Sequence, residues 1–160
     1  MTTDALFLSG LHEVEQGWID YNGHMNMGYY TVLFDRCADE AYEAMGFGPA
    51  YIEATGFTTY TAEFHIRYLR ELKLGDQVRC SFRMVDFDEK RFHFFQEMIH
   101  ADGWVAATGE SLALHVDTRG PKVAPMPEAR VKAVEAMYAR TSDFPLREDL
   151  GRSIGIRRKT

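Results

Sequence analysis

The sequence contains little of what marks several large classes of protein. Two of its 160 residues are cysteines, Cys37 and Cys80, and their wide separation fits neither a disulfide framework nor a metal-binding cluster. No apolar run approaches the ~20 residues that a membrane-spanning helix needs. The first ten residues, MTTDALFLSG, lack a basic leader. These absences predict a reduced, cytoplasmic protein that is neither secreted nor bound to membranes.

Positive charge is also in short supply. The chain carries 18 Lys and Arg against 24 Asp and Glu, a formal net charge of −6, whereas nucleic-acid binding needs a basic surface. No nucleic-acid partner is therefore expected, and an anionic small ligand would have to meet a local group of cations. The length and the hydrophobic fraction of 46% fit a single domain, residues 1–160, with a sizeable core.

What the chain does contain is a marked periodicity of its apolar residues. From about residue 27 to 45 they recur at helical spacing on one side, and charged residues occupy the other side. Asn26 is suited to cap the start of a helix, and Gly46 followed by Gly48 and Pro49 supplies a stop. These features predict one long amphipathic helix over about 27 to 45.

After this helix the period changes from 3.6 to 2. Apolar and polar residues alternate in four stretches that we expect to be strands, 60–69, 78–85, 91–100 and 104–116. Short links containing Gly and Asp favour antiparallel neighbours. A further strand is expected within residues 11–19, and a short helix over about 128 to 140 is expected to precede an irregular tail.

The helix must bury its apolar side, and a curved sheet is the only large partner available. The sequence therefore predicts an α+β fold in which an antiparallel sheet of about five strands wraps around one long central helix. The core of this domain is expected over about 10–118, with the short helix and the tail in 119–160.

The stretch IDYNGHMNMGYY, residues 19–30, places polar side chains on alternate positions directly before the predicted helix. They are Asp20, Asn22, His24 and Asn26. Such residues are also what a turn followed by an N-cap uses, so on their own they favour a solvated turn. The stretch alone therefore leaves two interpretations open, a turn or a reaction centre at a helix N-terminus.

The D-x-N-x-H-x-N run, together with the order of the elements, resembles the hotdog-fold acyl-CoA and acyl-carrier-protein thioesterases, including 4-hydroxybenzoyl-CoA thioesterase. The similarity covers about residues 10 to 118. The segments YTAEFHIRYLREL, LGDQV, HVDT and GRSIGI are in addition similar to a bacterial group that includes betainyl-CoA thioesterases. The resemblance implies a hotdog fold, hydrolysis of an acyl-CoA to free acid and CoA without a cofactor, and homodimers or homotetramers with active sites at subunit interfaces.

Thioester hydrolysis needs a nucleophile or base and donors for the developing oxyanion. Asp20 is the candidate carboxylate, either attacking directly or activating a water, and the sequence does not choose between these roles. Free backbone N–H groups at the start of the helix are the candidate oxyanion donors, within Asn26, Met27, Gly28 and Tyr29. Gly28 would let the substrate approach the backbone. The resemblance implies that Asn22 and His24 orient the carboxylate, the water or the carbonyl.

Further candidates lie on the strand that follows. Glu63 would position water or bind a cationic acyl group if it faces the site, and is otherwise part of an exposed polar face. Arg67 and Arg70 would bind the CoA phosphates or, alternatively, are solvated charges at a strand end. A cage of aromatic rings would suit a quaternary ammonium group. We expect no metal site, because His24 with Asp20 provides too few ligands.

Two other functions compete with acyl-CoA hydrolysis. A non-catalytic acyl-CoA-binding module would keep the fold and the pocket but would need no carboxylate beside the helix N-terminus. A hotdog dehydratase or hydratase also acts on acyl thioesters, but it usually carries its Asp and His in a different arrangement. Fold alone does not separate these functions. A short cationic acyl group such as betainyl is the most specific substrate that the resemblance implies.

Overall fold

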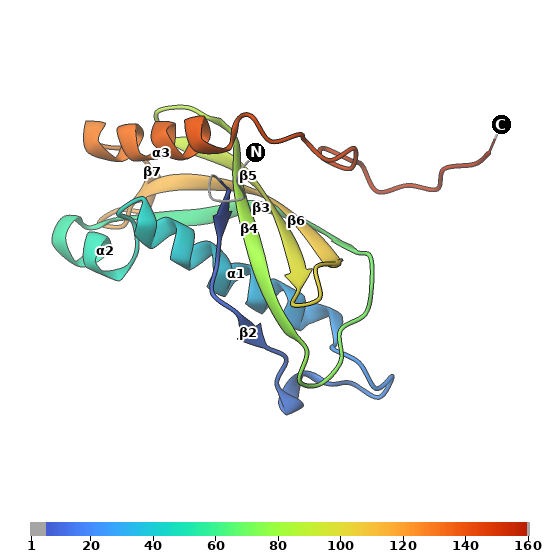
Figure 1. The fold of residues 1–160 in the computed structure, drawn as a ribbon. Coiled ribbons are helices and arrows are strands. Elements are labelled where there is room, and N and C mark those ends of the chain that lie inside the picture. The colour runs from blue at the N-terminus through green and yellow to red at the C-terminus, as the bar shows by residue number, and fades with distance from the viewer. Residues whose placement is uncertain (1–5, 160) are drawn as a thin grey trace.

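A computed structural model describes residues 6–159 of the chain (Figure 1). Its helices are α1 (Met27–Ala44), α2 (Pro49–Thr55) and α3 (Glu128–Thr141). Four strands are long, β3 (Phe57–Tyr68), β4 (Gln77–Phe87), β5 (Arg91–His100) and β6 (Val105–Asp117), and three have two residues each, β1 (Phe7–Leu8), β2 (His12–Glu13) and β7 (Lys122–Val123). All pairs are antiparallel in one sheet of order β1-β4-β5-β6-β3, with β2 on β4 and β7 on β6.

The sheet curls around α1, and α3 covers the opposite face (Figure 1). We call the face towards α1 the inner face and the other the outer face. Apolar residues of α1 are buried against the inner face, among them Leu33 and Phe34. Gly109 of β6 allows this approach, because a Cβ there would lie 2.9 Å from the Phe64 ring and 3.3 Å from Phe34. The wrapped central helix predicted from the apolar periods is thus confirmed.

Both predicted ends of α1 are confirmed. The Asn26 side chain accepts a hydrogen bond from the Gly28 N–H at the first turn. Gly46 follows the helix with φ of 81°, the left-handed conformation that commonly ends helices. The sequence did not reveal α2, since Pro49 was interpreted only as part of a stop. Proline is also favoured in the first helical turn, where its missing N–H is not needed.

The strand expected within residues 11–19 is wrong in extent. Only His12 and Glu13 pair there, and Gln16–Trp18 form a short 3-10 helix. A separate pair of residues, β1, joins β4 upstream. Between β1 and β2 the Ser9 hydroxyl accepts a hydrogen bond from the Cys80 N–H at 2.9 Å. A side chain thus takes the place of a ladder acceptor between β1 and β2, and β1 lies outside the stretch in which a strand was expected.

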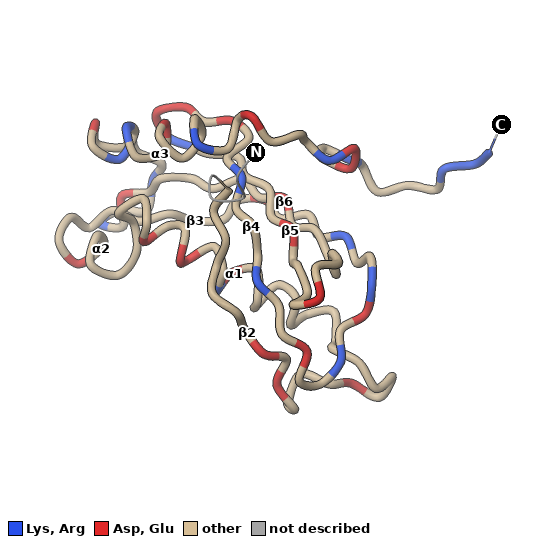
Figure 2. The backbone as a smooth tube through the Cα atoms, viewed as in Figure 1, with Lys and Arg blue, Asp and Glu red and all other residues tan. Residues whose placement is uncertain are grey.

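The helix expected at about 128 to 140 is confirmed as α3. The segment after it runs along the outer face and then extends away from the body (Figure 1). Its last described residues are basic (Figure 2). Within residues 6–159, no helix combines the length and the apolar character needed to cross a membrane.

Candidate active site

Asp20 opens a tight turn at the tip of a short hairpin. Its N–H donates to the His24 carbonyl at 3.1 Å, and its carbonyl accepts from the Gly23 N–H at 3.0 Å. Gly23 has φ of 78°, a conformation that side-chain-bearing residues rarely adopt. Ile19 pairs with Met25 at the base of the hairpin. The turn interpretation is therefore correct for the backbone, but it does not account for where the side chains point.

The Asp20 carboxylate is held by two donors. Oδ1 accepts from the Asn22 backbone N–H at 2.8 Å, and Oδ2 accepts from the Asn26 amide nitrogen at 3.3 Å. Asn26 also caps α1, because its Oδ1 accepts from the Gly28 N–H at 3.0 Å. The Asn22 amide makes no hydrogen bond within the described chain, so Asn22 orients Asp20 through its backbone. Asn26 is the residue whose side chain fixes the carboxylate at the helix start.

The hydrogen bonds at the start of α1 narrow the choice of oxyanion donor. The Asn26 N–H is bound to the Trp18 carbonyl, the Tyr29 N–H to the Asn26 carbonyl, and the Gly28 N–H to the capping side chain. The Met27 N–H has no acceptor among residues 6–159, so it is the free donor of the four candidates. Gly28 is exposed, and a ligand can approach the helix start directly above it.

These groups line a cavity of about 440 Å³, the Asp20 cavity. Its lining consists of Asp20, Tyr21, Asn22, His24, Met25, Asn26, Met27, Tyr30, Tyr68, Leu69, Arg70 and Glu71. His24 lies with Nε2 3.7 Å from a Glu71 carboxylate oxygen, and the Tyr68 hydroxyl donates to the Met27 carbonyl at 3.0 Å. Glu71 and Tyr68 were not predicted as site residues, although Arg70, which lies between them in the chain, was.

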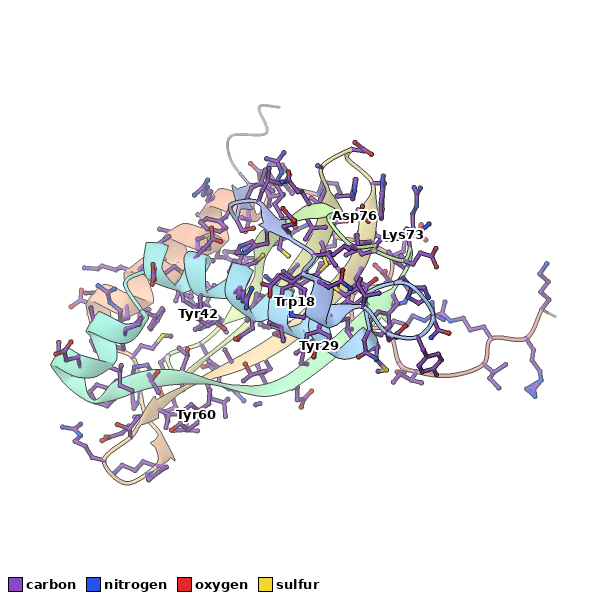
Figure 3. All side chains as sticks on the ribbon, turned by 90° about the horizontal axis from the view of Figure 1, so that it is seen from below. Trp18, Tyr29, Tyr42, Tyr60, Lys73 and Asp76 are labelled. Carbon is purple, nitrogen blue, oxygen red and sulfur yellow. The ribbon has the colours of Figure 1, made fainter. Side chains whose placement is uncertain are left out.

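Rigid aromatic packing supports the helix start. The Trp18 and Tyr29 rings stack with centroids 5.6 Å apart (Figure 3). Tyr30 meets Tyr68 edge to face at 5.1 Å. These contacts fix α1 to the segment before the Asp20 turn on one side and to β3 on the other. The position of the Asp20 turn relative to the free Met27 N–H is therefore held in place.

The structure separates the three candidates on β3 and beyond. Glu63 lines a different cavity, of about 720 Å³ on the outer face, so it does not meet Asp20 within one chain. Arg67 is bound to the Asp149 carboxylate at 2.6 Å and is therefore engaged inside the chain. Arg70 lines the Asp20 cavity, with its guanidinium 4.0 Å from the Trp104 ring centroid. Arg70 remains the candidate for binding CoA phosphates.

A second inner cavity of about 270 Å³, the helix cavity, lies further along α1. It is lined by Thr31, Val32, Phe34, Asp35, Ala38, Tyr42, Thr61, Phe64, Phe94, Gln96 and Ser111. Gly28, Thr31, Asp35, Ala38 and Tyr42 follow one another at spacings of three and four, so they form one stripe of the helix. This stripe leads from the Met27 N–H into the helix cavity.

The electrostatics of α1 are negative beside this cavity. Asp35, Asp39 and Glu43 recur every fourth residue and are all exposed, and Asp35 is the one of the three that also lines the helix cavity. The pKa of Asp39 is raised, first by burial and then by the charges of Asp35 and Glu43. The pKa of Tyr42 is also raised, first by burial and then by Asp35 and Asp39. The acidic row had been interpreted only as the polar side of an amphipathic helix, because the cavity beside it depends on the tertiary structure.

No cluster of three or more His, Cys, Asp or Glu side chains in the described part of the chain is arranged to bind a metal ion. Cys37 and Cys80 are free and buried in the core, away from the lining of the Asp20 cavity.

Comparison with known families decides to which of them the chain belongs. The model of the thioesterase-like superfamily matches residues 14–139, a range that includes the Asp20 turn, α1 and the four long strands. The chain belongs to the thioesterase-like superfamily. The resemblance seen in the D-x-N-x-H-x-N run is therefore confirmed at the level of the family.

Two curated relatives of this superfamily member carry related names. The betainyl-CoA thioesterase of Pseudomonas aeruginosa is 31% identical over 140 residues, covering 87% of this chain and 88% of that protein. The L-carnitine dehydrogenase/betainyl-CoA thioesterase of Rhizobium meliloti is 40% identical over 151 residues. That match covers 91% of this chain but 29% of the relative, so the chain spans less than a third of that protein's length.

Solved structures agree with the family assignment. A Staphylococcus aureus protein in complex with CoA gives a TM-score of 0.88 at 28% identity, covering 95% of this chain and 96% of that chain. A putative thioesterase from Pseudomonas putida KT2440 gives a TM-score of 0.81 at 26% identity, covering 96% and 98%. The expected hotdog fold is thus confirmed.

Proposed function

We propose that the chain hydrolyses acyl-CoA thioesters to a free acid and CoA at the Asp20 cavity. The observation that carries the proposal is the Asp20 carboxylate, held by Asn26 at the N-terminus of α1 beside the free Met27 N–H. A binding module would have no use for a carboxylate fixed next to an unpaired donor. The named thioesterase relatives support the same reaction.

The geometry supports two routes. In the first, a water gives a proton to Asp20 while its oxygen attacks the thioester carbonyl carbon. In the second, an Asp20 oxygen attacks that carbon, and water then hydrolyses the resulting anhydride. In both, negative charge develops on the carbonyl oxygen and the Met27 N–H, at the positive end of the helix, stabilises it. The C–S bond breaks, and the thiolate, a far weaker base than an alkoxide, leaves without a strong acid.

CoA would leave the cavity past the loop that follows β3. Arg70 lines the cavity on that side and is exposed, so its guanidinium is available to a phosphate. The likeness to a structure solved with CoA supports this assignment. We also place the activity in the cytoplasm, where the two free cysteines would remain reduced.

We infer that a second copy pairs along β3. This strand is twelve residues long and lies at the edge of the sheet, with Tyr60 to Glu63 exposed in its middle. Figure 3 shows Tyr60 on the side of β3 away from α1. Long bare edges are seldom left uncovered. Thr61 belongs both to this edge and to the helix cavity, so a second copy would form a wall of the cavity.

The helix cavity fits a short cationic acyl group. Asp35 makes no ion pair with any described residue, and the rings of Phe64 and Tyr42 also line the cavity. Asp35 lies eight residues from Met27, which is ~12 Å along the helix, and helical side chains lean back towards the N-terminus. A trimethylammonium group next to the reacting carbonyl would therefore come within reach of this carboxylate and these rings. The relatives named as betainyl-CoA thioesterases support this substrate.

The proposal is tested by thiol release from a panel of acyl-CoAs. Betainyl-CoA and 3,3-dimethylbutyryl-CoA form a matched pair, because the acyl groups have the same shape and differ by one positive charge. We expect both to be hydrolysed, with the higher kcat/KM for betainyl-CoA, and palmitoyl-CoA to be poorer than either. A protein that binds these compounds without releasing thiol would be a binding module. Hydration of an enoyl-CoA without thiol release would identify a hydratase.

Asp35→Asn is expected to remove the preference for the cation. A trimethylammonium group has no N–H to donate, so the contact is Coulombic, and near a protein surface two opposite charges ~4 Å apart attract by about 4 kcal/mol; kcat/KM for betainyl-CoA should therefore fall by about 10-fold or more. The value for 3,3-dimethylbutyryl-CoA should change little, since it has no charge to lose. Asp39→Asn is the matched control, because Asp39 lies one turn away and does not line the cavity. Equal losses for both substrates would refute a cation contact at Asp35.

A further inference from the structure

The segment that follows α3 is fastened across the outer face of the sheet. The Ser142 carbonyl accepts a hydrogen bond from Arg83 of β4 at 3.5 Å. Arg147 donates to the Glu97 carboxylate of β5 at 2.9 Å. The Gly151 N–H donates to a carboxylate oxygen of Glu110 on β6 at 2.8 Å. Residues 142–151 therefore cross the sheet strand by strand towards β3, and we call them the strap.

The strap is held most firmly at Asp149. One carboxylate oxygen accepts from Arg67 of β3 at 2.6 Å and the other from Arg147 at 3.0 Å, and Asp149 is 9% exposed. Burial raises the pKa of Asp149, but the hydrogen bond from Arg147 and the charges of both arginines outweigh it, so its pKa lies below the ordinary value. A buried carboxylate with two guanidinium partners is ionised at neutral pH. The chain is thus fixed at the edge strand itself.

The next eight residues have a different character. Residues 152–159, which we call the arm, begin with Arg152 in the lining of the chain's own outer cavity and then extend away from the body (Figure 1). Ile154 is 91% exposed and Ile156 is 84% exposed, although burying an isoleucine is worth ~1.5–3 kcal/mol. The arm also carries four cations and no carboxylate, while the whole chain has a net charge of −6 (Figure 2). The arm is fixed at its base and exposes two isoleucines beyond it. We therefore expect these isoleucines to be buried against a surface outside this chain.

We propose that the arm packs on a second copy of the chain, beyond the β3 edge, and that each copy receives the arm of the other. The inference rests on the proposed pairing along β3. Arg67 is part of that edge strand, so the strap delivers the arm to the same boundary that a second copy would cover. Eight extended residues reach ~26 Å, enough to cross onto the neighbouring subunit. In a two-fold assembly the exchange is reciprocal and closes the assembly.

The charge of a second copy complements the arm. The outer cavity of each chain is lined by the carboxylates of Glu63, Asp86, Asp88 and Glu110 and by the guanidinium groups of Arg91 and Arg152. Asp88 is paired with Arg91, and Glu110 is bound to His93 and to the strap, which leaves Glu63 and Asp86 without an ion pair among the described residues. Glu63 lies on the edge strand and makes no ion pair with any described residue, so it is available to a cation from outside. The isoleucines would bury apolar area at the junction, while Arg157, Arg158 and Lys159 meet acidic groups. The chemistry therefore favours this acidic protein itself as the partner.

The experiment places a photo-reactive benzoylphenylalanine at position 154 of the full chain and, as a control, at exposed Val123 of β7. Irradiation is expected to give a covalent dimer from position 154 and none from position 123. Mass spectrometry of the linked peptides should identify a peptide of the second copy. In parallel, sedimentation should show that Ile154→Asn with Ile156→Asn raises the dimer dissociation constant at least tenfold, whereas Val123→Asn leaves it unchanged.

The outcomes separate the arm from the assembly and from the activity. Wild-type chain that stays monomeric at all concentrations would refute both the β3 pairing and the arm. A stable dimer that gives only intramolecular cross-links from position 154, or that tolerates the double asparagine variant, would refute the arm alone. None of these measurements uses thiol release, so a failure of the proposed enzymatic function would be seen separately.

Discussion

Asp20→Asn is expected to lower kcat by about 10²–10⁴-fold while KM changes little. A positioned base contributes a factor of this size, and a nucleophile contributes at least as much. Asparagine keeps an oxygen that accepts from the Asn22 N–H, so the turn should survive, but it neither removes a proton nor attacks a carbonyl. The loss should fall on kcat because the carboxylate acts in the transition state. Thiol-release kinetics with a short acyl-CoA measure both constants.

Asp20→Ala extends this test to the structural role of the turn. Alanine removes the turn acceptor as well, so we expect the same catalytic loss together with a stability loss of ~1 kcal/mol. Asn22→Ala is the matched control, because Asn22 contacts Asp20 through its backbone N–H alone and its amide is exposed. It should stay within about threefold of wild-type kcat. If kcat of Asp20→Asn stayed within threefold of the wild-type value, a catalytic role for Asp20 would be refuted.

Substitution of Asn26 is expected to cause the second largest loss of kcat. Two substitutions separate its role as the cap of α1 from its role as the donor to Asp20. Asn26→Ala removes both the cap of α1 and the donor to Asp20, so stability should fall by ~1 kcal/mol and kcat by at least tenfold. Asn26→Asp keeps the cap, since aspartate caps helices as well as asparagine. It still loses the donor, and it places a second carboxylate beside Asp20. Melting curves should therefore separate the variants, while both lose activity.

The pH dependence of Asn26→Asp provides the sharper readout. Two carboxylates that share one site cannot both ionise easily, so protonation of the pair extends to higher pH. In the pH profile of kcat, the acid limb should shift to higher pH in Asn26→Asp and stay at the wild-type pH in Asn26→Ala. If Asn26 served only as a cap, Asn26→Asp would match the wild type in both stability and activity. That result would contradict a positioning role for its side chain.

Much of the fold follows from local patterns. The change of period marked α1 and the four long strands, and the cap at Asn26 and the stop at Gly46 were both read correctly. The split first strand was not predictable, because it depends on the Ser9 hydroxyl meeting a backbone N–H 71 residues away. The helix α2 was missed because Gly48 and Pro49 signal both the end of one helix and the start of the next.

The candidate site could be predicted only in part. Asp20 and the helix start were found because their residues are consecutive in the chain. Arg67 illustrates the limit, since nothing near it in sequence indicates that Asp149, 82 residues later, occupies its guanidinium. Glu63 and Asp35 illustrate a second limit of prediction from the sequence. Which of two acids faces an inner cavity depends on how the sheet curves around α1, and the strand or helix period alone does not determine it.

The most direct test of the central claim compares wild type with Asp20→Asn in one experiment on betainyl-CoA and 3,3-dimethylbutyryl-CoA. Calorimetry measures binding to the variant, and thiol and acid release are counted for both proteins. We expect the variant to bind the intact thioesters with affinities within a few-fold of the wild-type KM and to release almost no thiol. The wild type should release one thiol and one acid per thioester consumed. Equal thiol release by the two proteins, or none by the wild type with any member of the acyl-CoA panel, would contradict hydrolysis at Asp20.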